Sequence, residues 1–315
     1  MQKPYSILLY YCYTSIEHPE SLRKSHHQYC LAKGLRGRVI IVHEGINGTI
    51  SGKRDACAAY MQYLKQDTRF VNIHFKVTPH HDHVFKKLHV RTKAEIVHAG
   101  LPHIMPHKKT GTYLAPKTLQ QMYNEEEVVL LDVRSNYEHK LGKFKGAITL
   151  DMDNFRAFPH KVASLSNLKN KKVITYCTGG VKCEKASAHL LDQGFKQVYQ
   201  LRGGIIQYGM DTDGANFEGT CYVFDRRLTV PINTQNATLI SRCELCHTAC
   251  DRMVNCANPV CNKHVPICVS CAQAYLGACS KTCQRHPKKR PYNVTGYYTA
   301  QTRGYNPYQG ASRNK

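Results

Sequence analysis

The stretch VITYCTGGVKCEKASAHL (residues 173–190) restricts the fold more than any other part of the 315-residue sequence. Its β-branched and aromatic start predicts a buried strand that ends at Cys177, and the residues from Glu184 onward predict a helix. Gly179 and Gly180 allow the backbone to turn sharply between the two elements. A strand, a tight turn and a helix in this order are typical of α/β domains, which bind ligands at the carboxyl ends of their strands.

The same alternation of strands and helices continues on both sides of this stretch. Strands are predicted at 128–135, 172–177 and 197–203, and helices at 116–123, 162–168, 184–193 and after Gly203. This order predicts a doubly wound α/β domain with a mostly parallel sheet, which we assign to residues 116–220.

The N-terminal segment, residues 1–95, has a different order of elements. Strand, helix, strand, strand, helix and strand are predicted in turn, at 5–13, 20–33, 37–52 (two strands), 55–65 and 70–77. Asn47-Gly48 predicts the hairpin turn between the two middle strands, because both residues tolerate positive φ. The order fits a ferredoxin-like α+β domain, and residues 96–115, with their prolines and glycines, are expected to form a linker.

Cys177 is the candidate catalytic residue, because its surroundings favour a thiolate. The two glycines let backbone N–H groups point toward the sulfur, and the start of the following helix adds a partial positive charge. Lys182 adds a full positive charge, so we expect a nucleophile with a lowered pKa. The candidate active-site loop comprises Thr178, Gly179, Gly180, Val181, Lys182 and Cys183.

The length of this loop separates two kinds of cysteine chemistry. Cysteine phosphatases need an arginine six residues after the nucleophile, and this chain has Cys183 there. The tighter ring instead suits a small adduct, such as the outer sulfur of a persulfide. Cys183 could either resolve an oxidised Cys177 as a disulfide or pack in the first turn of the helix. Asp132 and Arg134, at the end of another strand, are expected to hold the loop scaffold together.

Nine of the fifteen cysteines lie between Cys243 and Cys283, in a segment without a hydrophobic period. The segment has two Cys-x-x-Cys pairs and few large apolar side chains, so a bound metal would supply folding free energy that its core lacks. Eight thiolates could fill two tetrahedral zinc sites, with the candidate ligands Cys243, Cys246, Cys256, Cys261, Cys268, Cys271, Cys279 and Cys283. Reduced cysteines packed without metal are the alternative. We assign this module to residues 238–290 and expect residues 291–315 to form a mobile, basic and Tyr-rich tail.

The formal net charge of +22 is unevenly distributed. Lys and Arg exceed Asp and Glu by 10 in residues 1–110, by 3 in residues 111–235 and by 9 in residues 236–315. Two basic segments around a nearly balanced one favour a nucleic acid as the partner, through the release of counterions. The apolar run at residues 5–13 is too short to span a membrane and lacks a basic leader. We therefore expect a soluble, cytoplasmic protein that does not bind membranes.

Several longer stretches resemble one bacterial family. LLDVRSNYEHKLGKFKGAITL (130–150) and YCTGGVKCEKAS (176–187) are similar to a rhodanese domain, and GRVIIVHEGINGTISG, LHVRTKAEIVHAGL and NCANPVCN extend the similarity over residues 1–290. This combination resembles the bacterial rhodanese-domain tRNA uridine(34) hydroxylases. The resemblance implies formation of 5-hydroxyuridine at the wobble position, with tRNA bound through its anticodon region, no DNA partner, and molecular oxygen as co-substrate.

By the same resemblance, Cys177 corresponds to the family's active-site cysteine, described as a persulfide-type nucleophile. Lys182 stands where the family usually has arginine, so the charge is kept and the planar fork is lost. No flavin, haem or nicotinamide motif is evident in the sequence, so the electrons are expected from an unidentified donor. Two other functions fit the residues: a sulfurtransferase that passes a Cys177 persulfide to an acceptor, and a non-enzymatic RNA-binding adaptor.

Overall fold

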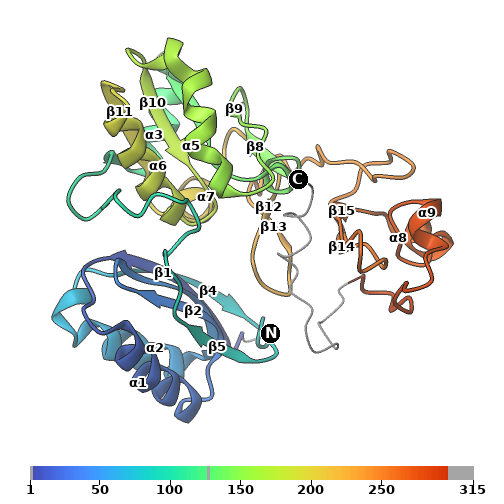
Figure 1. Ribbon diagram of the computed structural model, residues 1–315, viewed down its shortest axis with the longest axis horizontal. Helices are drawn as coiled ribbons and strands as arrows, with labels where there is room; N and C mark the ends of the chain where they lie inside the picture. Colours follow the sequence, from blue (N-terminus) through green and yellow to red (C-terminus); the bar gives the residue numbers. More distant parts are fainter. Residues whose placement is uncertain (1–2, 126–127, 297–315) are drawn as a thin grey trace.

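The computed structural model describes residues 3–125 and 128–296, which form two larger domains and a smaller cysteine-rich module (Figure 1). The predicted fold class is confirmed, because an α+β domain comes first, a parallel α/β domain follows, and the cysteine-rich module comes last. Most of the predicted tail, residues 297–315, lies outside the described residues. No helix in the described part of the chain is long and apolar enough to cross a membrane.

The N-terminal domain contains one five-stranded sheet and two α-helices. Its elements are β1 (Tyr5–Tyr13), α1 (Pro19–Ala32), β2 (Arg36–Val42), β3 (Gly45–Lys53), α2 (Arg54–Lys65), β4 (His74–His80) and β5 (Leu88–Arg91). The strand order is β4-β1-β3-β2-β5, in which the first four strands pair antiparallel and β5 pairs in parallel with β2. This is the predicted ferredoxin-like order, extended by β5 at one edge.

The predicted hairpin turn at Asn47-Gly48 is wrong. β2 and β3 are joined at His43 and Glu44, and Asn47-Gly48 lies inside β3. A Cβ atom at position 48 would overlap the side chain of Tyr10 on the neighbouring strand. The glycine therefore allows a tyrosine ring to pack against the strand, which is the other structural reason for glycine in a sheet.

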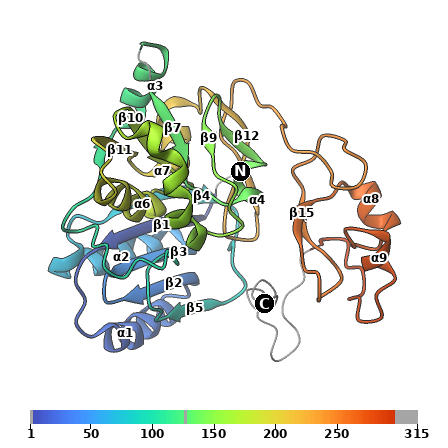
Figure 2. The same ribbon diagram turned by 45° about the horizontal axis from the view of Figure 1, so that its top comes forward.

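Helices cover only one face of this sheet (Figure 1). Leu8 and Tyr10 of β1 belong to the buried core beneath α1 and α2. Because side chains alternate along a strand, Leu9, Tyr11 and Tyr13 point to the opposite, helix-free face. This helix-free face lies toward the central domain (Figures 1 and 2).

The central domain is built on a parallel sheet with the order β6-β11-β10-β7-β9. Its helices and strands are β6 (Thr112–Leu114), α3 (Pro116–Glu125), β7 (Val129–Asp132), α4 (Asn136–His139), β8 (Gly142–Phe144), β9 (Ile148–Thr149), α5 (Phe158–Lys161), β10 (Lys172–Tyr176), α6 (Val181–Asp192), β11 (Gln197–Leu201), α7 (Gly204–Thr212), β12 (Phe217–Tyr222) and β13 (Thr229–Pro231). Strands β13, β12 and β8 form a second, three-stranded sheet.

Three details of this domain differ from the prediction. α6 begins at Val181 rather than at Glu184, so the helix start lies closer to Cys177. The helix expected at 162–168 is a 3₁₀-helix. β6 lies inside the predicted linker and pairs with β11. The prediction missed this strand because three residues are too few to show a hydrophobic period.

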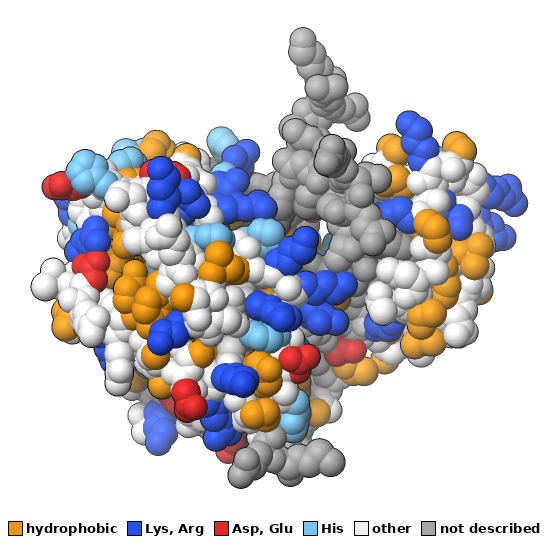
Figure 3. Space-filling model, turned by 90° about the horizontal axis from the view of Figure 1, so that it is seen from below, with side chains coloured by type: hydrophobic (Ala, Val, Ile, Leu, Met, Phe, Trp, Pro, Cys, Tyr) orange, Lys and Arg blue, Asp and Glu red, His pale blue; other side chains and the backbone are white. Residues whose placement is uncertain are grey.

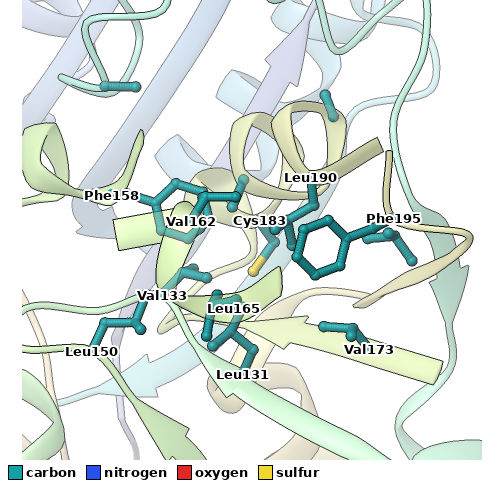
Figure 4. Packing of buried hydrophobic residues seen from close by; sticks show 14 of the residues in the cluster. Leu131, Val133, Leu150, Phe158, Val162, Leu165, Val173, Cys183, Leu190 and Phe195 are labelled. Atoms are coloured by element: carbon teal, nitrogen blue, oxygen red, sulfur yellow. The ribbon is translucent and has the colours of Figure 1, made fainter. Parts of the chain in front are cut away.

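The hydrophobic core beside β10 and α6 contains Cys183. Figure 4 shows Cys183 among Val133, Leu165 and Leu190, which come from separate elements of the domain. Cys183 is fully buried in this cluster. The start of α6 is therefore anchored in the core directly behind the candidate active-site loop.

The cysteine-rich module has little regular structure and stands to one side of the two larger domains (Figure 2). Its elements are β14 (Met253–Asn255), β15 (His264–Pro266), α8 (Val269–Ala274) and α9 (Lys281–Gln284). The ring of His264 packs against Tyr137 and Tyr222, with ring centroids 5.7 and 5.4 Å away, so the module contacts the central domain through β15.

Candidate active site

Cys177 follows β10, the middle strand of the parallel sheet, and therefore lies at the carboxyl end of that sheet. Its sulfur accepts a hydrogen bond from the backbone N–H of Gly180 at 3.1 Å. Gly180 has a φ of 97° and immediately precedes α6, so a glycine is required at this turn. Cys177 is 2 % exposed, which removes the sulfur from bulk water.

The surroundings of Cys177 favour the thiolate form. Burial raises the pKa of the Cys177 thiol, but the Cys183 thiol, the Lys182 charge and the backbone N–H groups of Lys182 and Gly180 together lower the pKa to about 6. Burial and the Cys177 thiolate raise the pKa of Cys183 well above its usual value. The thiolate is therefore the favoured form of Cys177, and the thiol is the favoured form of Cys183.

The start of α7 supports the loop from behind. The N–H of Ile205 donates to the carbonyl oxygen of Cys177 at 3.0 Å, and the N–H of Ile206 donates to that of Thr178 at 3.1 Å. Gly204 has a φ of 66°, and a Cβ atom there would overlap the carbonyl oxygen of Cys177. Main-chain contacts between two sequence-distant turns therefore fix the position of Cys177.

Lys182 is paired with a carboxylate rather than free in the loop. Its Nζ lies 2.6 Å from Oε2 of Glu138, a fully buried side chain. The same Oε2 accepts the N–H of Ser135 at the start of α4, at 3.1 Å. The carboxylate of Glu138 therefore balances part of the positive charge that Lys182 was expected to bring to the loop.

Asp132 and Arg134 lie behind the loop, fully buried. Nη2 of Arg134 is 2.6 Å from Oδ2 of Asp132 and donates to the carbonyl oxygen of Gly142 at 2.6 Å. Oδ1 of Asp132 accepts the N–H of Arg134 at 3.0 Å. The pair joins β7 to β8, and neither side chain is exposed.

The N-terminal domain also contacts the candidate active-site loop. No sequence motif indicated this contact between the two domains. The hydroxyl of Tyr11 donates to Oε1 of Glu184 at 2.9 Å, and that of Tyr13 donates to the carbonyl oxygen of Val181 at 3.3 Å. A Cβ atom on Gly179 would lie 3.1 Å from the side chain of Leu9. The sequence does contain one sign of this contact. Leu9, Tyr11 and Tyr13 are spaced two residues apart, so all three lie on one face of β1.

The eight candidate metal ligands come together in two groups of four. Their sulfur atoms lie within 4.8 Å of one another in each group: Cys243, Cys246, Cys268 and Cys271 in the first, and Cys256, Cys261, Cys279 and Cys283 in the second. All eight are free thiols rather than disulfides. Backbone N–H groups of Cys268 and Cys279 point to sulfur atoms of Cys243 and Cys256, at 3.4 and 3.5 Å. Cys250 belongs to neither group.

Comparison with known proteins agrees with this order of domains. Residues 5–96 match the model of the UPF0176 acylphosphatase like domain, residues 115–210 that of the rhodanese-like domain, and residues 218–284 that of the rhodanase C-terminal region. A protein of Cytophaga hutchinsonii named tRNA uridine(34) hydroxylase is 55 % identical over 311 residues, which cover 99 % of this chain and all of the relative. The chain belongs to the tRNA uridine(34) hydroxylase family.

Other members of the tRNA uridine(34) hydroxylase family are similar over nearly the same length. The relative from Bacillus cytotoxicus is 43 % identical and covers 92 % of this chain, with 91 % of its own length matched. The relative from Listeria welshimeri is also 43 % identical, and 90 % of each chain is covered. The similarity therefore includes the N-terminal domain and the cysteine-rich module as well as the rhodanese-like domain.

Proposed function

We propose that this protein hydroxylates the wobble uridine of tRNA to 5-hydroxyuridine, with Cys177 as the nucleophile. The single observation that carries the proposal is the thiolate-stabilising loop of Cys177, in a chain that matches a hydroxylase of this family along 99 % of its length. A protein that acts on tRNA is expected to work in the cytoplasm. Molecular oxygen is the proposed co-substrate, and the electron donor is a separate molecule.

The chemistry of uracil gives Cys177 a definite role. Addition of the thiolate to C6 of the ring would make C5 electron-rich and able to react with oxygen. One oxygen atom would stay on C5, and the other would leave as water with two electrons from the separate donor and two protons. The loop N–H groups and the start of α6 stabilise the sulfur as an anion before it attacks. Because the thiolate is regenerated when the sulfur leaves C6, Cys177 would act catalytically.

The helix-free face of the N-terminal sheet supports binding of an RNA strand. The register of β2 and β5 places Arg38 beside His89. The side chains of Arg38, His89 and Arg91 are exposed. Their neighbours Val39 and Val90 belong to the core beneath the helices. Because side chains alternate along a strand, the three basic residues lie on the helix-free face. Arg38, His89 and Arg91 would face backbone phosphates near the anticodon. Figure 3, seen from below, shows the side of the N-terminal domain on which α1 and α2 lie, and Lys, Arg and His side chains are spread over that side too, with few acidic ones among them.

The cysteine-rich module is proposed to bind two zinc ions. Four thiolates within 4.8 Å of one another suit the tetrahedral coordination that zinc prefers, and the backbone N–H groups directed at Cys243 and Cys256 would stabilise those sulfurs as anions. Bound zinc would hold the module in shape by joining segments that have almost no regular secondary structure. The zinc is a structural component in this proposal and takes no part in the hydroxylation.

The test is mass spectrometry of tRNA nucleosides from cells that lack the gene and carry a plasmid-borne copy. The wild-type protein and Cys57→Ser are expected to restore 5-hydroxyuridine derivatives, whereas Cys177→Ser is not. Cys57 is the matched control, because it is buried and its pKa is raised to about 11, mainly by burial. Restoration by Cys177→Ser, or no change of these nucleosides on loss of the gene, would contradict the proposal.

A sulfurtransferase remains the second candidate, because the same N–H groups would stabilise a persulfide on Cys177. Purified protein would then transfer sulfur from thiosulfate to cyanide at a rate similar to that of a dedicated rhodanese. We expect a much lower rate, and a high rate together with unchanged tRNA nucleosides would favour the sulfurtransferase.

A further inference from the structure

Lys76 brings a second cation to the candidate active site from a different domain. It lies in β4 directly opposite Leu9 of β1, and both side chains are on the helix-free face. Leu9 and Tyr11 of this face contact the glycines of the Cys177 loop. The Lys76 Nζ lies 5.3 Å from the centroid of the Tyr11 ring. Lys76 therefore points from the N-terminal sheet toward the loop.

Lys76 is buried, and no carboxylate of the described residues lies within ion-pair distance of it. It is 2 % exposed, and within the described residues, 3–125 and 128–296, its ammonium has no hydrogen bond or ion pair. The other lysines at this domain boundary each face a carboxylate: Lys182 is 2.6 Å from Glu138, and Lys185 is 2.8 Å from Glu44. A lysine that is almost entirely buried and forms no ion pair disfavours folding, so a reason for keeping it is expected in the function of the site.

We propose that Lys76 is a residue of the active site, supplied by the N-terminal domain, whose ammonium stabilises the negative charge of Cys177. The site is then shared between two domains, and the N-terminal domain does more than bind RNA. The inference rests on the nucleophilic role proposed for Cys177 but not on the identity of the substrate.

The electrostatics of the boundary agree with this geometry. Burial lowers the pKa of Lys76 to about 8, while Cys177 and Glu184 act in the opposite direction. The charged and titratable groups around Cys177 and Lys76 come from β1, β4, α4 and α6, and they are Tyr11, Tyr13, Lys76, Glu138, Lys182, Cys183 and Glu184. With Lys182 paired to Glu138, Lys76 is the cation of this set that has no carboxylate of its own.

The test is a pH titration of the Cys177 thiolate in the full-length protein without tRNA. The ultraviolet absorbance of the thiolate is measured for each variant and for the same variant carrying Cys177→Ser, and the difference isolates Cys177. The wild-type midpoint is expected near the pKa of about 6. In Lys76→Met the midpoint is expected to rise by about one pH unit, because loss of a nearby opposite charge disfavours the anion.

Two control variants separate charge from shape. Lys76→Arg keeps the charge and is expected to keep the midpoint near that of the wild type. Lys65→Met removes an exposed charge at the end of α2, on the helix-covered side, and is expected to leave the midpoint unchanged. Because methionine fills the same space without a buried charge, Lys76→Met is expected to unfold at the same or a higher temperature than the wild type.

The rate of tRNA hydroxylation should follow the thiolate population. A rise of one unit in the midpoint lowers the thiolate fraction about fivefold at pH 6, about twofold at pH 7 and hardly at all at pH 9. An unchanged midpoint in Lys76→Met, or an equal rise in Lys65→Met, would overturn the proposal. If no variant hydroxylates tRNA, the proposed function fails, and the thiolate titration still decides the role of Lys76.

Discussion

Three Asp-x-Arg pairs adopt the same local geometry in this chain and differ in how much water reaches them. In each pair the aspartate accepts the backbone N–H of the arginine at 3.0 Å and faces its guanidinium. The arginine and aspartate side chains are 36 % and 26 % exposed in Asp67–Arg69, 23 % and 1 % in Asp225–Arg227, and 0 % and 0 % in Asp132–Arg134. Burial, rather than geometry, therefore distinguishes the pair behind the active-site loop.

The free energy of unfolding should depend on this burial. Asp132→Asn leaves the Arg134 charge buried without a counter-charge, so we expect a loss of about 3 kcal/mol or more. Asp67→Asn, in a water-exposed pair, should cost less than about 1 kcal/mol, and Asp225→Asn should fall between the two. Urea unfolding of the three variants measures the costs, and an equal cost for Asp67→Asn and Asp132→Asn would refute the explanation.

At the scale of elements, the candidate site depends on the contact between two helix starts. The turn before α6 carries Cys177, and the turn before α7 supports it through main-chain hydrogen bonds. Side chains play little part in this contact, because the backbone carbonyl oxygen of Cys177 lies so close to Gly204 that a side chain at position 204 would overlap it. The sulfur can therefore keep its position only while the two helix starts remain close.

Gly204→Ala should push these two turns apart. The added Cβ would overlap the carbonyl oxygen of Cys177 and would also require a φ that alanine disfavours, so we expect loss of most activity and about 2 kcal/mol or more of stability. Gly146→Ala is the matched control, because Gly146 has a φ of 72° but open space around its Cα. Hydroxylation rates and urea unfolding of both variants separate the overlap from the backbone strain. Equal effects in the two would mean that the contact with Cys177 is unimportant.

At the scale of the whole molecule, the two larger domains meet at the Cys177 loop, and the cysteine-rich module contacts the central domain beside it. The N-terminal sheet contacts the loop through Leu9 and Tyr11, and Lys185 of α6 lies 2.8 Å from Glu44 of the N-terminal domain. The cysteine-rich module contacts the central domain through His264 and Met253, beside Tyr222. The carbonyl oxygen of Tyr222 accepts the hydroxyl of Thr178, so this contact reaches the loop as well.

Removal of zinc should unfold the cysteine-rich module and leave the other two domains folded. We expect about two zinc ions per chain by elemental analysis, and after chelation we expect new protease cleavage sites within residues 238–290. Binding of tRNA should weaken and become less sensitive to salt, because a basic segment loses its shape. Cys246→Ser should lower the zinc content to about one ion, whereas Cys250→Ser should leave it unchanged. Folding of the module without any metal would show that its thiols only pack together.

Local patterns were sufficient to predict the elements that depend on neighbouring residues. The strand before Cys177, the glycine turn and the following helix occur in the predicted order, although the helix begins three residues earlier than predicted, because β-branched residues, glycines and a helical period act over a few residues. The same kind of reasoning failed at Asn47-Gly48, where glycine serves a contact with Tyr10 on another strand. It also missed β6, whose three residues become a strand only through pairing with β11.

The sequence by itself determined the order of the three units, the candidate nucleophile and the set of eight cysteines, since each follows from the kind and spacing of residues close together in the chain. Only the tertiary structure decided how those cysteines divide, with 243 and 246 joining 268 and 271, while 256 and 261 join 279 and 283. Only the tertiary structure brought Tyr11 and Tyr13 to the start of α6 beside Cys177, and Lys76 to the ring of Tyr11, although these residues lie about a hundred positions or more before Cys177 in the chain. The physical reason is that contacts between distant segments depend on which faces can be buried together, and the packing of whole sheets and helices fixes those faces.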